Sequence, residues 1–239
     1  MNNSRFVLLA GLLGVGGHAQ AQRVLLRENP AQDTVASVFG PNRAYYNHFY
    51  VGYGLVAGPG SARAGAGLRY GNSAEIVVGL RNKFRVSQAL ALGFDLRYAR
   101  VAYYLAQNAQ KVVPNPAPHY REYLALPQAQ LEGFVRVNYG RRGNVIGRYV
   151  DVGGWGGWVI STAHHYEDRP ATSGAKRVDV TEHGLDYLRR WTYGAGLRAG
   201  SSRYALTARY RLSDVFTAPY QGLYPELPRW VVGLELGWL

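Results

Sequence analysis

The chain contains no cysteine and one methionine among its 239 residues, and charged residues make up only 18% of it. The absence of cysteine excludes a disulfide framework, a thiolate nucleophile and a cysteine-ligated zinc site. The charged fraction lies below the roughly one quarter that is typical of soluble domains. Long apolar runs are also missing, since the run Phe6–Gly17 is too short for the ~20 residues that a membrane-spanning helix needs.

Glycine, tyrosine and positive charge are abundant instead. The chain has 30 glycines, 19 tyrosines and a formal net charge of +12. Its apolar fraction of 47% is ordinary for a folded protein and argues against disorder. A strongly basic chain suits an anionic partner such as nucleic acid or acidic lipid. The sequence shows no helix-turn-helix, zinc-finger or RNA-binding motif, so we do not expect nucleic acid as a partner.

Residues 1–21 have the features of a secretory signal peptide. A short polar start with one positive charge precedes the apolar run Phe6–Gly17. Ala19 and Ala21 then fit the small-x-small pattern that signal peptidase reads, which predicts cleavage after Ala21. We therefore expect the protein to leave the cytoplasm.

Beyond residue 43, apolar side chains recur at every second position. In Gln88–Tyr98, for example, the even positions are large and apolar, whereas the odd positions are small or charged. This period predicts strands with one apolar face and one small or charged face. The alternation is found in eight segments: residues 48–55, 75–86, 88–98, 130–139, 150–160, 190–198, 203–212 and 230–238.

Short and long connections between these segments alternate along the chain. The short ones fall near residues 87–88, 140–144 and 200–202, and the long ones near 58–73, 106–121, 166–187 and 216–228. Tight turns at one end and long loops at the other are typical of outer-membrane barrels. The predicted fold is all-β, a single antiparallel transmembrane β-barrel with an up-and-down meander, most simply of eight strands. If Ala62–Tyr70 also formed a strand, a further N-terminal strand would be needed to keep the number even, which would make ten. We expect a periplasmic lead over 22–42 and the barrel over 43–239.

A secreted β-sandwich or a lipocalin-like barrel is the alternative, because the period does not tell inside from outside. In those folds the apolar face points inward. Glycine and alanine on the charged face favour the membrane barrel, since they suit a narrow interior. Tyrosine and tryptophan near strand ends favour it too, because they match interfacial girdles.

The segments Tyr123–Pro127, Val150–Trp158, Trp191–Leu197 and Ala208–Tyr210 resemble the PorT-type outer-membrane β-barrel domain of Bacteroidetes. The resemblance covers roughly residues 43–239. It implies an outer-membrane barrel of a Gram-negative bacterium, inserted by the barrel-assembly machinery. That machinery reads an aromatic C-terminal signal in this family, which here corresponds to Trp230, Trp238 and Leu239. A named role in type IX secretion does not follow.

Charged residues on the small-residue face are expected to point into the lumen. The predicted set is Glu75, Arg81, Lys83, Arg85, Asp95, Arg97, Glu132, Arg136, Asp151, Arg190, Arg198, Arg209, Arg211 and Glu235. Buried charges must be paired, so these residues would form a network that fills the narrow interior. A narrow anion-selective pore is the alternative, because nine of the fourteen are basic and five are acidic.

The long loops suggest where a function would lie. We predict a non-enzymatic structural or interaction role through loops 106–121 and 166–187, without cofactor or metal. A lipid-modifying enzyme using Ser161, His164 and Asp168 is a weaker alternative, as is a divalent-ion site among the histidines and carboxylates of 164–186. The expected partners are outer-membrane lipid and lipopolysaccharide, the barrel-assembly machinery during insertion, and an unidentified envelope protein.

Overall fold

The computed structural model describes residues 39–59, 65–140, 143–170 and 174–238. The predicted signal peptide and Leu239 lie outside the described residues, as does most of the predicted lead. The elements are β1 (Tyr45–Ala57), β2 (Ala74–Arg85), β3 (Leu90–Tyr104), β4 (Arg121–Tyr139), β5 (Arg148–Val159), β6 (Ala163–Asp168), β7 (Val178–His183), β8 (Trp191–Ser201), β9 (Tyr204–Arg211), the 3-10 turn η4 (Ala218–Tyr220) and β10 (Trp230–Trp238).

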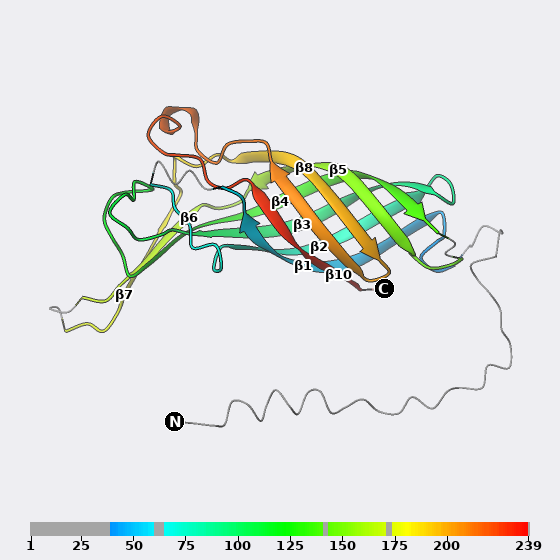
Figure 1. Cartoon of the computed structure of the whole chain (residues 1–239), viewed down its shortest axis with the longest axis horizontal. Helices are drawn as coiled ribbons and strands as arrows, with labels where there is room; N and C mark the ends of the chain where they lie inside the picture. The colour runs from blue at the N-terminus through cyan, green and yellow to red at the C-terminus, as the bar shows by residue number, and fades with distance from the viewer. Residues whose placement is uncertain (1–38, 60–64, 141–142, 171–173, 239) are drawn as a thin grey trace, which may run out of the picture.

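Eight of the strands close into an antiparallel barrel. All ten strands belong to one sheet, but β6 and β7 are attached to its side, so the remaining eight form the ring. β1 pairs with β10, β3 pairs with β4, and β5 pairs with β8, which completes the closure (Figure 1). The eight-stranded meander is thus confirmed. The ten-stranded alternative is wrong, because the described part of Ala62–Tyr70 contributes only an isolated bridge between Leu68 and Leu105.

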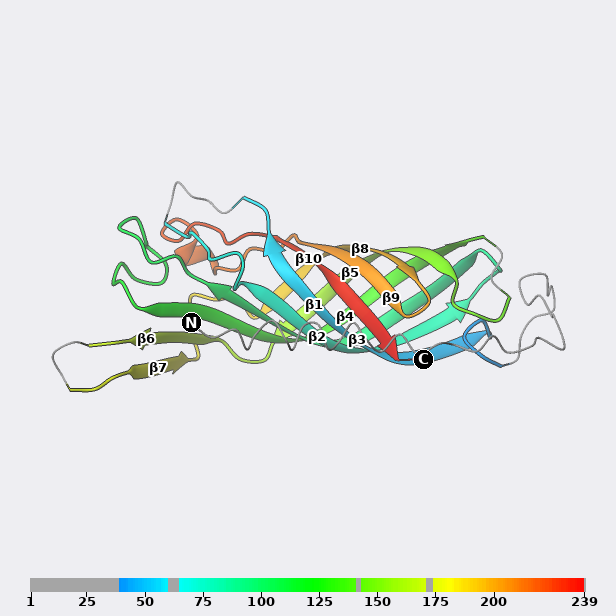
Figure 2. The same ribbon diagram turned by 60° about the horizontal axis from the view of Figure 1, so that its bottom comes forward.

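The two ends of the barrel differ. The short connections lie at one end, called here the turn end, where Phe49 near the start of the barrel pairs with Trp238. The long connections lie at the other, called here the loop end. The loop predicted at 166–187 is not irregular throughout, because β6 and β7 form a hairpin that projects from this end (Figure 2). The hairpin is held by pairing of β6 with Arg121–Ala125 of β4, the longest strand.

The barrel has the reverse polarity of a soluble β-protein. Outward side chains are large, apolar and exposed: Trp191 is 65% exposed and Leu234 63%. Inward side chains are charged and buried: Asp95 is 0% exposed and Arg136 1%. The alternation of residues did not show whether the apolar face of the strands points inward or outward; in the structure it points outward. Among the described residues, no helix has the length and apolarity to cross a membrane.

The loop end has a hydrophobic core of its own. Strand residues such as Val101 and Leu124 pack there with loop residues such as Leu188, Phe216 and Leu227, all of them buried. Tyr187, Tyr220 and Tyr224 pack against this core. We call the described connections at this end, residues 58–59, 65–73, 105–120, 160–190 without 171–173, and 212–229, the cap. Because the cap has its own core, it is a packed layer at the barrel mouth.

Candidate functional site: the charged lumen and the cap

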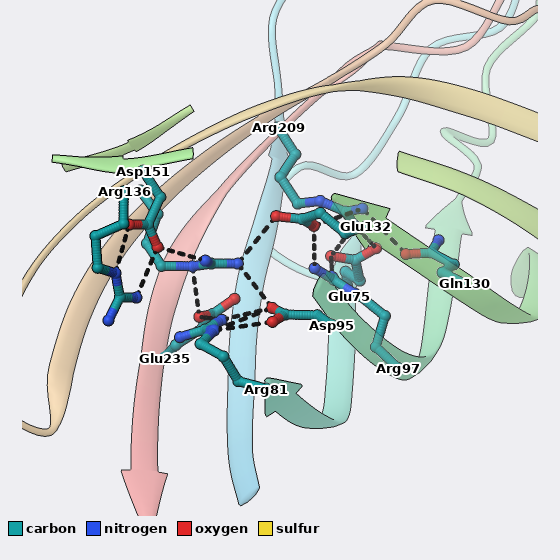
Figure 3. Close-up of polar contacts among 11 residues, drawn as sticks. Glu75, Arg81, Asp95, Arg97, Gln130, Glu132, Arg136, Asp151, Arg209 and Glu235 are labelled. Atoms are coloured by element: carbon teal, nitrogen blue, oxygen red, sulfur yellow. Dashed lines mark hydrogen bonds and ion pairs between the residues drawn. The ribbon is translucent and has the colours of Figure 1, made fainter. Parts of the chain in front are cut away.

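Ten charged side chains meet in the middle of the lumen. They come from seven of the eight barrel strands and point inward because they occupy the inner positions of the period of two. The arginines are Arg81, Arg97, Arg136, Arg198 and Arg209, and the carboxylates are Glu75, Asp95, Glu132, Asp151 and Glu235 (Figure 3). We call these ten residues the lumen network.

Arg198 of β8 is the centre of the lumen network. Its guanidinium lies 3.0 Å from a carboxylate oxygen of Asp95 and 3.0 Å from one of Glu132. It also lies 2.8 Å from Asp151 and 2.9 Å from Glu235. One cation therefore contacts carboxylates from four different strands, and its planar, multidentate group suits this task.

The other arginines complete the network. Arg136 and Asp151 form a two-pronged pair with distances of 2.7 and 2.8 Å. Arg81 binds Asp95 at 2.8 Å. On the loop-end side, Arg97 lies 3.0 Å from Glu132. Arg209 lies 3.2 Å from Glu75 and 3.0 Å from the amide oxygen of Gln130, a polar partner that charge patterns alone do not reveal.

The lumen network itself has no basic excess, although Lys83 and Arg211, two further cations of the predicted set, are also buried. Removing Lys83, Arg85, Arg190 and Arg211 from the nine predicted cations leaves five, which balance the five carboxylates. Lys83 donates to the carbonyl of Pro41 at 2.5 Å, and Arg211 binds the cap residue Glu226 at 2.7 Å.

Two of these cations lie at strand ends. Arg85 is the last residue of β2 and is partly exposed. The prediction for Arg190 is wrong, because this residue precedes β8 and is exposed. The predicted alternation includes Arg190, one residue before the start of β8, where the period of two no longer applies.

Little free volume remains inside the barrel. A cavity lined by Trp155, Arg209 and Arg211 measures about 30 Å³, and another beside Gly52 and Arg97 measures about 10 Å³. Such volumes accommodate one or a few waters. The charges of the lumen network therefore balance, and these two cavities leave little free volume beside it.

A second buried polar group lies within the cap, where the hairpin meets β4. His164 of β6 is between two carboxylates: Nε2 lies 2.7 Å from Glu122 and Nδ1 lies 2.9 Å from Glu182. Lys111 contacts Glu122 at 2.5 Å, and Gln107 donates to it at 2.7 Å. The sequence interpretation missed both residues, because Lys111 lies inside the predicted loop 106–121 and Glu122 at its boundary, where the period of two is not visible.

Hydrogen bonding fixes the charge states in this group. Burial alone would lower the pKa of His164, but hydrogen bonds to Glu122 and Glu182 raise it above the ordinary 6.5. Burial would raise the pKa of Glu122, yet hydrogen bonds from His164 and Lys111 hold it below 4.5. These hydrogen bonds thus favour the protonated form of the His164 imidazole between the two carboxylates that attach the hairpin.

This charge state predicts that the hairpin is held less firmly at alkaline pH. A raised histidine pKa contributes stability below the unfolded value of about 6.5, and that contribution is lost as the pH rises through the folded pKa. Amide exchange in β6 and β7, corrected for its intrinsic rate, should therefore be faster at about pH 9 than at about pH 6. The dependence should disappear in His164→Gln and persist in His165→Gln, whose ring is more exposed. Equal pH dependence in both variants would contradict the assignment to His164.

Ser161, His164 and Asp168, the residues considered for a lipid-modifying enzyme, do not form a catalytic triad. Both ring nitrogens of His164 contact glutamates. Asp168 instead accepts from His119 at 3.0 Å. No nitrogen of His164 remains to take a proton from Ser161. Within the described segments, no group of three or more histidine and acidic side chains is arranged to hold a metal ion.

A closed barrel that exposes apolar side chains and buries its charges has the architecture of transmembrane β-barrels. No family model and no curated protein matches the chain, so the resemblance to PorT-type barrels stays a prediction. Among solved structures, the chain is similar to Ail, the attachment invasion locus protein of Yersinia pestis. The identity is 11%, the TM-score is 0.36, and the match covers 82% of this chain and 99% of that chain. The barrel is assigned from the chain's own strand pairings.

Proposed function

We propose that this protein is an integral outer-membrane β-barrel with a non-enzymatic structural or interaction role, carried by its cap. The observation on which this rests is the combination of a charge-balanced lumen network that occupies the barrel interior with a packed loop end. A barrel of eight strands leaves an interior just wide enough for side chains. The barrel then serves as a rigid support, and binding falls to the loops that it holds.

Membrane insertion is supported by the outer surface of the strands. Apolar side chains such as Val51, Leu96 and Leu197 are about half exposed there, which is costly in water and favourable in lipid. Aromatic side chains flank them at both ends: Tyr45 and Tyr139 near the turn end, Trp158 and Trp191 near the loop end. This arrangement matches an apolar band between two interfacial girdles.

The lumen network disfavours the pore. An anion-selective channel needs unpaired positive charge along an open path. Here the five arginines of the lumen network are matched by five carboxylates, and two cavities beside them measure about 30 and 10 Å³. The cap core adds a further apolar barrier at the mouth.

Removing the hairpin tests the role of the cap. Ala163 and His183 are cross-strand partners, so residues 164–182 can be replaced by Asn-Gly, a turn suited to two-residue hairpin loops. We expect this variant to be extracted from outer membranes as a folded barrel, like the full chain, but without the envelope proteins that accompany the full chain in mild detergent. The comparison is made by native mass determination.

Three outcomes would contradict the proposal. Absence of the full chain from outer membranes would remove the proposed location. The same companions in the full chain and the variant would separate binding from the hairpin. Steady single-channel conductance of the purified full chain in a planar bilayer would favour a pore.

A further inference from the structure

An aromatic row crosses the outer face of the sheet just beneath the cap. Tyr104 of β3 is the cross-strand partner of Tyr123 of β4, which is in turn the partner of His165 of β6. Ring centroids are 4.8 Å apart in both contacts. These rings point outward, since Tyr103 and Leu124, their chain neighbours, are buried on the inner side.

Three arginines surround this row. Arg121 donates to the hydroxyl of Tyr104 at 3.1 Å, and its guanidinium lies 4.9 Å from the centre of that ring. The backbone N–H of Arg69 donates to the carbonyl of Tyr104 at 2.8 Å, which places Arg69 beside the row. Arg100 shares the outward side of β3 with Tyr104, four residues away, or about 13 Å along the strand. We call Arg69, Arg100, Arg121, Tyr104 and Tyr123 the arginine–tyrosine face.

These arginines differ from those of the lumen network in having no acidic partner. Among the described residues, Arg69, Arg100 and Arg121 form no ion pair, whereas every arginine of the lumen network forms at least one. Glu167, the cross-strand partner of Arg121, is buried and forms an ion pair with Arg169, whose Nε lies 3.1 Å from its carboxylate. The face therefore presents positive charge that no described carboxylate of the chain neutralises.

The arginine–tyrosine face begins with Arg100 at the upper edge of the apolar band and extends from there toward the cap. Tyr98 lies at the level of the aromatic girdle near the loop end and precedes Arg100 by two positions on the same side of β3. Pro127, the partner of Arg100, is two residues from Ala129, which pairs with Trp158 of the same girdle. A side chain one step above the girdle reaches the level of lipid head groups.

We propose that the arginine–tyrosine face binds a phosphorylated glycolipid of the outer leaflet. Guanidinium groups recognise phosphate oxygens through paired, charge-assisted hydrogen bonds. The span from Arg121 to the position of Arg100 opposite Pro127 is six residues, or about 20 Å, so the arginines contact more than one phosphate of a wide head group. The tyrosine rings between them offer a flat surface for a sugar. This inference rests on the proposed membrane location and names a lipid partner for it.

The test uses the full chain purified from outer membranes in mild detergent. The variant Arg69→Gln/Arg100→Gln/Arg121→Gln is compared with Arg148→Gln/Arg203→Gln, which removes exposed arginines of the turn end that also form no ion pair among the described residues. Native mass spectrometry measures binding of added diphosphoryl lipid A, with phosphatidylglycerol as an anionic lipid that lacks the phosphorylated sugar. We expect the triple variant to bind lipid A at least about tenfold more weakly, and the control to bind within about twofold of the wild type.

Each other outcome overturns the inference. Equal lipid A binding by the triple variant and the wild type would remove the site. An equal loss of lipid A binding in the control variant would show that only the net charge of the protein matters. If the wild type bound phosphatidylglycerol as tightly as lipid A, the face would be a general contact for anionic lipids. These failures are separate from failure of the proposed function, which would show as absence of the full chain from outer membranes before any lipid is added.

Discussion

Replacing Arg198 by methionine is expected to destabilise the folded barrel by roughly 3–5 kcal/mol, because it removes the one cation that contacts four carboxylates. The lumen network would keep four arginines and five carboxylates. The surplus negative charge would be buried in a space with room for few waters. Asp95 and Glu235 would both be left with a single shared arginine of the network, Arg81, at 2.8 and 2.7 Å.

Restoring neutrality provides the control. In Arg198→Met/Glu235→Gln, four arginines face four carboxylates. Asp95 keeps Arg81, and Asp151 keeps Arg136. We expect this double variant to regain a substantial part of the lost stability, as measured by urea unfolding of the barrel in lipid vesicles. A single variant as stable as the wild type, or a double variant less stable than the single one, would show that charge balance in the lumen does not govern stability.

The neutrality of the lumen network also shows that the net positive charge of the chain lies outside this network. Its ten charges cancel, so the net charge of +12 belongs to the rest of the sequence. On the described outer surface, Arg69, Arg100 and Arg121 are part of that excess. The inference from composition that this protein suits an anionic partner therefore directs attention to the outer face of the barrel and away from its interior.

Which side chains point into the lumen could largely be predicted, because the alternation of inward and outward positions (parity) depends only on neighbouring residues of the same strand. Once Leu96 was assigned outward, Asp95 and Arg97 had to point inward, whatever the pairing of their strands. The same reasoning failed for Arg190, because parity has meaning only within a strand and the start of β8 could not be located to the residue.

The pairings inside the lumen could not be predicted. Arg198 and Asp95 are separated by 103 positions and come together only through barrel closure. The hairpin and its attachment were hidden for another reason. His164 and Glu122 lie on segments whose alternation is too short to recognise, and their contact depends on the cap being packed.

Replacing Gly194 by alanine is expected to destabilise the barrel by about 1–3 kcal/mol, through overpacking alone. A Cβ at this position would lie 2.1 Å from the carbonyl oxygen of Tyr210 and 2.7 Å from the ring of Trp155. The first atom belongs to the backbone of β9, so the strand itself must shift. The Trp155 ring is buried and stacks under Arg209, with the guanidinium 4.4 Å from the ring centre, so it too has little room.

The matched control is Gly156→Ala on the neighbouring strand. Gly156 pairs with Tyr193, the residue before Gly194, but it faces outward and a Cβ there would meet nothing within 4 Å. Its effect on the free energy of unfolding should stay within about 0.5 kcal/mol. Both glycines lose the same backbone freedom on substitution, so the difference between the two variants isolates the crowding inside the barrel. Equal effects would mean that the inner glycines are not required by the packing of the lumen, and the filled interior would no longer be an argument against a pore.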